Sequence, residues 1–187
     1  MKPLTQLAHE AISKVLHAGD VAIDLTAGNG WDTRFLASCV GPTGHVYAFD
    51  IQTTAIHATR RLLVQHGLDF CITLENASHA DWITKVPLEH RRKIKAAMMN
   101  LGYLPSGDKS IVTQASSTII AIQSLLEWLQ PNGVLTILAY TGHPGGQTEA
   151  DAVQALLANL DSKIYAITQE PAKPAPQVPI LYVVGTI

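Results

Sequence analysis

The chain has 187 residues, with 13 lysines and arginines against 15 aspartates and glutamates, and a formal net charge of −2. Hydrophobic residues make up 47% and charged residues 15%, which excludes a disordered chain and predicts one domain over residues 1–187. No apolar run approaches the roughly 20 residues that span a bilayer, and the first residues lack the apolar core of a signal peptide. We therefore expect a cytoplasmic protein with no membrane partner, and the balanced charge argues against a broad electrostatic nucleic-acid binder.

The first part of the chain alternates helix and strand. Residues 4–17 carry apolar side chains at helical spacing, and we expect this N-terminal helix, within residues 1–18, to pack on the domain. Residues 21–25 form a short apolar run typical of a buried parallel strand. A glycine-rich turn leads to a predicted helix at 31–39 and a second strand at 45–49.

The middle of the chain continues this alternation. Helical spacing marks residues 55–66, and Gly67 is placed to end that helix. A third strand is predicted at 71–74 and a fourth at 94–99, with a short helix at 80–85 between them.

The last part closes the sheet. A helix at 110–129, a turn at 131–133, an apolar strand at 134–138 and a helix at 147–159 come first. Two strands, 164–168 and 180–184, follow with only a loop between them, which contains Pro171, Pro174, Pro176 and Pro179. Strands joined without a helix pair antiparallel, so the pattern predicts a three-layer α/β fold. Its sheet is Rossmann-like and seven-stranded, mostly parallel with an antiparallel final strand.

A glycine loop, Asp24-Leu-Thr-Ala-Gly-Asn-Gly30, lies between a strand and a helix, where open α/β sheets bind ligands. Gly28 and Gly30 let a ligand approach the backbone closely, and Asp50, after the second strand, suits the two hydroxyls of a ribose. A simple glycine turn with a capping aspartate is the alternative. The predicted cofactor-binding residues are Asp24, Thr26, Gly28, Asn29, Gly30, Asp50, Gln52, Ser78, His79 and Asn100.

Three nucleotide ligands fit such a loop in principle. The dinucleotide pattern needs a third glycine where this chain has Thr33, and no lysine follows as in a phosphate-binding P-loop. Asp24 would repel a pyrophosphate but could hold the ammonium of a methionine moiety. S-adenosyl-L-methionine is therefore the favoured cofactor.

The fourth strand ends in Asn100-Leu-Gly-Tyr103, which resembles the Asn-Pro-Pro-Tyr motif of methyltransferases that act on exocyclic amino groups of bases. In that motif the asparagine accepts N–H bonds from the acceptor and the aromatic ring stacks on the base. Asn100 and Tyr103 are the first candidate catalytic residues, although an asparagine capping a turn has the same pattern. Tyr140 and His143, after the fifth strand, are the second pair, since an alkylammonium acceptor must lose a proton before it is methylated.

Several other residues are weaker candidates. Ser78 and His79 follow the third strand and are placed to line an adenine pocket, although a lone histidine is more often structural. No His, Cys, Asp or Glu spacing supports a metal site. The cluster His90-Arg-Arg-Lys93 is the basic patch that could contact RNA phosphates, although such a run is usually a solvated face.

Four motifs in order resemble a family of small class I methyltransferases that are known as rRNA methylases. They are Asp24-Leu-Thr-Ala-Gly-Asn-Gly30, Phe49-Asp-Ile-Gln52, Met99-Asn-Leu-Gly-Tyr-Leu-Pro105 with Gly107-Asp-Lys109, and Tyr140-Thr-Gly-His-Pro-Gly-Gly146. The resemblance covers nearly the whole chain and departs from the family pattern at Trp31. It implies methylation of the 5-aminomethyl group of (2-thio)uridine at the tRNA wobble position, the tRNA anticodon region as partner, and a possible homodimer.

Two other functions stay open at this point. One is methylation of rRNA or of a small-molecule amine on the same fold. The other is a non-catalytic cofactor-sensing or RNA-binding module, which would predict a damaged acceptor site, whereas Asn100 and Tyr103 are both present.

Overall fold

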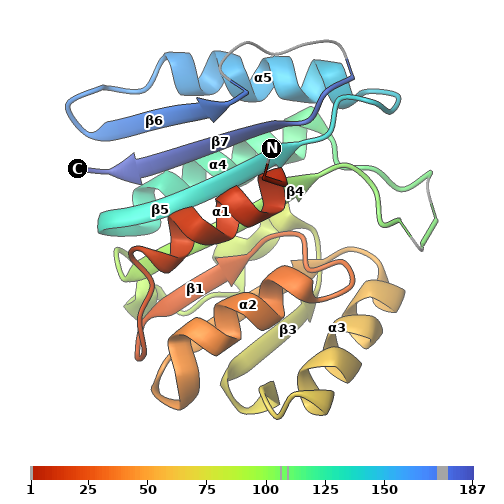
Figure 1. Ribbon diagram of the computed structural model, residues 1–187, viewed down its shortest axis with the longest axis vertical. Helices are drawn as coiled ribbons and strands as arrows, with labels where there is room; N and C mark the ends of the chain where they lie inside the picture. The colour runs from red at the N-terminus through yellow and green to blue at the C-terminus, as the bar shows by residue number, and fades with distance from the viewer. Residues whose placement is uncertain (1, 106, 109, 172–176) are drawn as a thin grey trace.

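The computed structural model describes residues 2–105, 107–108, 110–171 and 177–187, and its sheet carries helices on both faces (Figure 1). The seven strands lie in the order β3-β2-β1-β4-β5-β7-β6. Their bounds are β1 Val21–Asp24, β2 His45–Asp50, β3 Ile72–Asn76, β4 Ile94–Leu101, β5 Leu129–Ala139, β6 Tyr165–Glu170 and β7 Ile180–Thr186. Strands β1 to β5 pair in parallel, and β7 pairs antiparallel with both β5 and β6. This confirms the predicted fold class.

The helices divide between the two faces of the sheet. Helices α1 (Leu4–Ser13), α2 (Trp31–Val40) and α3 (Thr53–Gln65) cover one face, and α4 (Ala115–Trp128) and α5 (Gly146–Ala158) cover the other (Figure 1). Four 3₁₀ turns lie between these elements: η1 Gly41–Thr43, η2 Asp69–Cys71, η3 His79–Thr84 and η4 Leu88–His90.

Alternate side chains of each strand enter different cores. Ala22 of β1 packs in the core of α1, α2 and α3, whereas Ile23, next in the strand, packs in the core of α4, α5 and η3. Because both faces of the central strands are covered, those strands are continuous apolar runs, which is the signal that the sequence showed.

Several predicted boundaries were wrong. The helix predicted at 110–129 begins only at Ala115, because the N–H of Thr113 donates to the carbonyl of Gly102 and Val112 forms a β-bridge with Tyr103. β5 starts at Leu129 rather than at residue 134. The turn predicted at 131–133 lies within this strand, at the point where its pairing with β4 shifts register and Asn132 has a φ of 58°.

The other differences are smaller. The first helix ends at Ser13 rather than 17, β4 runs on to Leu101, and the last two strands extend to Glu170 and Thr186. Of the loop prolines, Pro174 and Pro176 lie outside the described residues, as does Lys109. Every helix in the described part of the chain is too short or too polar to cross a bilayer.

Candidate functional site

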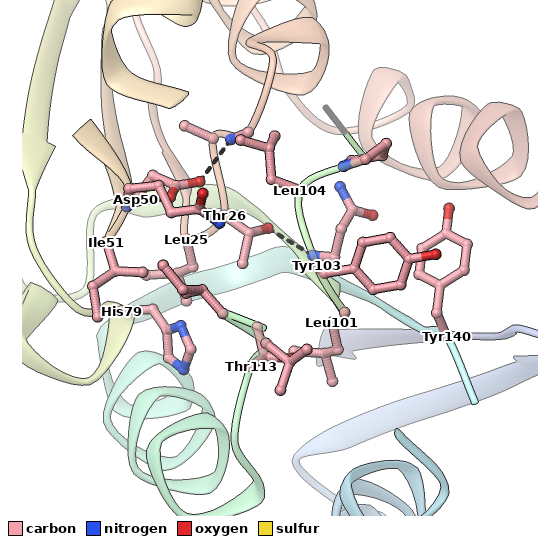
Figure 2. A pocket seen from close by; sticks show the side chains of 18 of the residues that line it. Leu25, Thr26, Asp50, Ile51, His79, Leu101, Tyr103, Leu104, Thr113 and Tyr140 are labelled. Carbon is pink, nitrogen blue, oxygen red and sulfur yellow. Dashed lines mark hydrogen bonds between the residues drawn. The ribbon is translucent and has the colours of Figure 1, made fainter. Parts of the chain in front are cut away.

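A cavity of about 740 Å³ opens at the carboxyl ends of the central strands. It lies where the chain leaves β1 in one direction and β4 in the other, the switch point at which open α/β sheets bind ligands. Its volume is within the roughly 300–1,000 Å³ that is usual for small-molecule and cofactor sites. Asp50, Ile51 and His79 lie at one end, and Tyr103 and Tyr140 lie at the other (Figure 2).

The glycine loop and Asp50 form the first end of the cavity. Gly28 lines the cavity at φ 53°, and its N–H donates to Oδ2 of Asp50 over 2.9 Å. The N–H of Gln52 donates to Oδ1 of Asp50 over 2.8 Å. Burial raises the pKa of the Asp50 carboxyl, while these two backbone N–H groups lower it. Each carboxylate oxygen keeps a further lone pair, so the group can accept hydrogen bonds from two ribose hydroxyls.

The structure does not place Asp24 and Gly30 on the wall of the cavity. Asp24 is fully buried; its Oδ1 accepts from the N–H of Thr26 and its Oδ2 accepts from the hydroxyl of Thr33. An ammonium therefore has no direct path to this carboxylate. Gly30 begins α2 at φ 86°, where a Cβ atom would lie 2.8 Å from the Cα of Thr59. Both residues therefore hold the conformation of the glycine loop, Asp24 through its hydrogen bonds and Gly30 through its close packing on Thr59.

His79 and Ser78, which the sequence analysis proposed for an adenine pocket, line the same cavity as Asp50. The Nε2 atom of His79 is 3.0 Å from the hydroxyl of Ser117, and burial lowers the pKa of the ring to about 4. Ser78 begins η3, and its hydroxyl accepts from the N–H of Ala80. A neutral imidazole and apolar neighbours such as Ile51 form a wall that suits a flat, uncharged ring such as adenine.

Asn100 and two tyrosines form the other end. Asn100 lies near the carboxyl end of β4, and its N–H donates to the hydroxyl of Thr26 over 2.7 Å. Tyr103 is 41% exposed and Tyr140 is 40% exposed, so both rings are available to a ligand. Burial raises the pKa of the Tyr140 phenol, and the charge of Asp32 adds to the rise. This end offers an amide and two aromatic rings to a nitrogen-bearing base.

His143 lines the cavity next to Tyr103. Its Nδ1 is 3.0 Å from the carbonyl oxygen of Pro144, and its Nε2 is buried without a hydrogen-bond partner. The ring packs edge-on against Tyr103, with centroids 5.8 Å apart. In this conformation the ring of His143 supports Tyr103.

Sequence reasoning missed two residues at the end of the cavity that Asn100, Tyr103 and Tyr140 form, which we call the acceptor end. His9 of α1 and Asp32 in the first turn of α2 both line the cavity. The Nε2 atom of His9 is 2.6 Å from Oδ1 of Asp32, and the amide nitrogen of Asn100 donates to Oδ2 of Asp32. Asp32 could have been found as a carboxylate two residues after the glycine loop. Nothing in the spacing pointed to His9.

The sheet order and the cavity at its switch point define a class I methyltransferase fold. The family model described as "Putative rRNA methylase" matches residues 46–184. The chain belongs to this family, as the sequence motifs predicted.

Two curated proteins are similar to this chain in sequence. A chloroplastic tRNA (mnm(5)s(2)U34)-methyltransferase of Arabidopsis thaliana is 37% identical over an alignment of 167 residues, and the match covers 85% of this chain. The chain spans 60% of that relative's length. The ribosomal RNA small subunit methyltransferase H of Acinetobacter baylyi is 34% identical over 104 residues, which cover 54% of this chain and 33% of that protein.

Solved structures of similar length match the whole chain. An rRNA-methylase from Clostridium thermocellum is 36% identical with a TM-score of 0.93, and the match covers 100% of this chain and 99% of that one. A methyltransferase from Streptococcus mutans in complex with SAH is 34% identical with a TM-score of 0.87, over 100% of this chain and 99% of that one.

Proposed function

We propose that this protein is an S-adenosylmethionine-dependent methyltransferase that acts on tRNA. Its acceptor is the 5-aminomethyl group of a (2-thio)uridine at the wobble position of the anticodon. The observation that carries the proposal is the cavity itself, which has a ribose-binding carboxylate, Asp50, at one end and the Asn100–Tyr103 pair at the other.

The cofactor assignment is supported from two sides. The chemistry of the first end fits a nucleoside, with Asp50 toward the ribose, His79 and Ser78 toward the base, and Gly28 toward the chain that continues from the ribose. The Streptococcus mutans relative was solved in complex with SAH. When bound, S-adenosylmethionine supplies an activated methyl group on a sulfonium.

The protein's own residues have little acid or base chemistry to supply. Methyl transfer is an in-line displacement, and holding the two reactants in line accounts for much of the acceleration. Asn100 is placed to accept an N–H of the acceptor, and Tyr103 and Tyr140 are placed to stack on or beside its base.

The choice of tRNA over rRNA rests on the Arabidopsis relative. That protein is matched over most of this chain, and its name specifies U34 of tRNA. The Acinetobacter relative, which is named for rRNA, is matched over 54% of this chain, and the rRNA descriptions of the family model and of the Clostridium thermocellum structure name no nucleotide. The acceptor end also suits an amine on a base better than a ring carbon, since it presents an amide and aromatic rings.

The test is transfer of a tritiated methyl group. The purified protein is given bulk tRNA that lacks the terminal wobble methyl, deproteinised rRNA, or free alkylamines, and the nucleosides of the product are separated. We expect label in a 5-methylaminomethyl nucleoside of tRNA alone. Label in rRNA, or in free amines without tRNA, would contradict the proposed substrate, and absence of transfer to every acceptor would contradict the activity.

A further inference from the structure

The carboxylate of Asp32 lies at the acceptor end of the cavity, and none of the roles above uses it. Its Oδ1 is 2.6 Å from Nε2 of His9, and its Oδ2 accepts from Nδ2 of Asn100. The side chain of Asp32 is 12% exposed and that of His9 is 30% exposed, so the pair is half enclosed and still open to the cavity. Three elements far apart in sequence, α1, α2 and β4, thus meet at one carboxylate.

The contact with Asp32 fixes which way the amide of Asn100 points. A carboxylate only accepts hydrogen bonds, so the NH₂ group of Asn100 must face Asp32. The backbone N–H of Asn100 is held separately by the hydroxyl of Thr26. The amide oxygen is therefore the atom that remains to accept an N–H from a ligand.

The charge of the cavity favours a cation at this end. Among the described residues that line it, Asp32 and Asp50 are carboxylates and none is lysine or arginine. Both oxygens of Asp50 accept backbone N–H groups, whereas the partners of Asp32 are two side chains. Asp32 also lies in the first turn of α2, where the helix dipole favours a negative side chain.

His9 is held in the orientation that serves Asp32. Its ring stacks on Phe35 with centroids 3.9 Å apart and an interplanar angle of 6°. With the ring fixed by this stack, its Nε2–H can only donate to Asp32. The N-terminal helix therefore belongs to the site and does more than cover the sheet.

We propose that Asp32 and Asn100 form the subsite for the positively charged primary amine of the acceptor, with His9 as the positioning residue. The inference rests on the proposed function and deepens it. Asp32 accepts one N–H of the ammonium and the oxygen of Asn100 accepts another. Before methyl transfer the ammonium gives the proton that faces Asp32 to that carboxylate, which frees the lone pair of the nitrogen. This pins the nitrogen between the tyrosines and the end of the cavity assigned to the cofactor, and it makes the protein prefer an aminomethyl group to a neutral group of the same size.

The test is a binding experiment that needs no turnover. Two anticodon stem–loop RNAs carry 5-aminomethyluridine or 5-hydroxymethyluridine at the wobble position, and their affinities are measured with S-adenosylhomocysteine present. We expect the native protein to prefer the amine by about 10- to 100-fold, the range of a hydrogen-bonded charge. Asp32→Asn removes this preference and leaves the affinity for S-adenosylhomocysteine within about threefold. The control variant Asp50→Asn does the reverse.

Two variants of His9 separate positioning from folding. His9→Phe keeps the stack on Phe35 and loses the donor, so we expect kcat to fall about tenfold with an unchanged thermal midpoint. His9→Gln keeps a donor that can reach Asp32, so we expect it to retain most of the native kcat. If both variants behave alike, the hydrogen bond has no positioning role.

The failures of the two proposals are distinguishable. If tRNA is not methylated by the native protein, the proposed function fails. If tRNA is methylated but Asp32→Asn keeps the preference for the amine, the subsite is wrong. An Asp32→Asn variant that binds S-adenosylhomocysteine ten times more weakly would instead assign Asp32 to the methionine end of the cofactor.

Discussion

Asp24 is a buried carboxyl group whose protonation is linked to folding. Burial raises its pKa to about 7, and the neighbouring charge of Asp32 adds to the rise. In the unfolded chain the value is near 4, so between these two pH values the folded protein holds a proton that the unfolded chain has lost. The favourable contribution of Asp24 to the free energy of unfolding is complete below about pH 4 and is lost as the pH rises through about 7. The loss is up to about 4 kcal/mol.

Replacing Asp24 by asparagine removes this titration. The amide oxygen can still accept from the N–H of Thr26, and the amide nitrogen can donate to the hydroxyl of Thr33. We expect urea unfolding to show Asp24→Asn gaining stability relative to the native protein between pH 5 and pH 8, by roughly 2 kcal/mol or more. Parallel stability curves for the two proteins across this range would show that Asp24 does not titrate there.

Among the residues that line the cavity, Asp50 is the one whose replacement should weaken cofactor binding most. It is placed to accept from a ribose, and it also holds the N–H groups of Gly28 and Gln52. We expect Asp50→Ala to lower the affinity for S-adenosylmethionine by about 10- to 100-fold in calorimetry, since hydrogen bonds to a charged group are lost. Asp69→Ala is the control, because it removes an exposed carboxylate of η2 that does not line the cavity. Native affinity in Asp50→Ala would refute the ribose assignment.

At the scale of elements, the packing of α2 on α3 depends on one glycine. Gly30 and Gly145 both begin a helix with left-handed φ, 86° and 83°, but a Cβ at Gly30 would strike the backbone of Thr59, whereas one at Gly145 would meet nothing within 4 Å. Alanine at either position carries the cost of its conformation, and Gly30→Ala adds a clash. We expect Gly30→Ala to lose about 1–3 kcal/mol more than Gly145→Ala in denaturant unfolding. Equal losses would mean that α3 shifts freely.

The elements were predictable where the signal is local. Apolar runs and glycine stops gave the seven strands and five helices, since buried strands and capped helices carry their patterns in consecutive residues. The start of α4 was not predictable, because it depends on Thr113 bonding to Gly102 and to Glu149, residues distant in sequence. His9 was missed for the same reason: only the tertiary packing of α1 brings it to Asp32.

The residues of the site were likewise predictable only in part. The glycine loop and Asn100 lie at strand ends, and the topology of parallel sheets gathers such ends at one edge. Whether a side chain then faces the cavity depends on how the loop folds, which spacing does not encode. Asp24 is therefore buried behind the residues that line the cavity, while Asp32, eight residues later, lines it.

At the scale of the whole molecule, two clusters of basic residues differ in their position relative to the cavity. Arg91, Arg92 and Lys93 come directly before β4, at its amino end, whereas the cavity lies at its carboxyl end. Eight residues of strand separate the two by about 25 Å. Arg91 also approaches Glu127 at 3.9 Å, which offsets its charge. The patch that the sequence singled out is thus poorly placed to hold RNA at the cavity.

A second basic surface is better placed. Arg60 and Arg61 are exposed on α3, next to Thr59, whose hydroxyl donates to the carbonyl of Gly28 in the glycine loop. On the adjoining α2, the guanidinium of Arg34 lies 5.3 Å from the ring centroid of Trp31, and Trp31 is 59% exposed at the cavity rim. Exposed cations beside an exposed aromatic ring suit an RNA backbone and an unstacked base.

Two double charge reversals test this difference with the same change in net charge. We expect Arg60→Glu with Arg61→Glu to raise KM for tRNA about tenfold or more at physiological salt and to reduce the salt dependence of binding, because phosphate contacts release counterions. Arg91→Glu with Arg92→Glu should change KM by less than about twofold, since any long-range repulsion is screened beyond about 8 Å. The reverse ranking would place the RNA along the amino ends of the strands. The target base would then have to flip out and reach the cavity from an RNA backbone that is bound at the other end of the sheet.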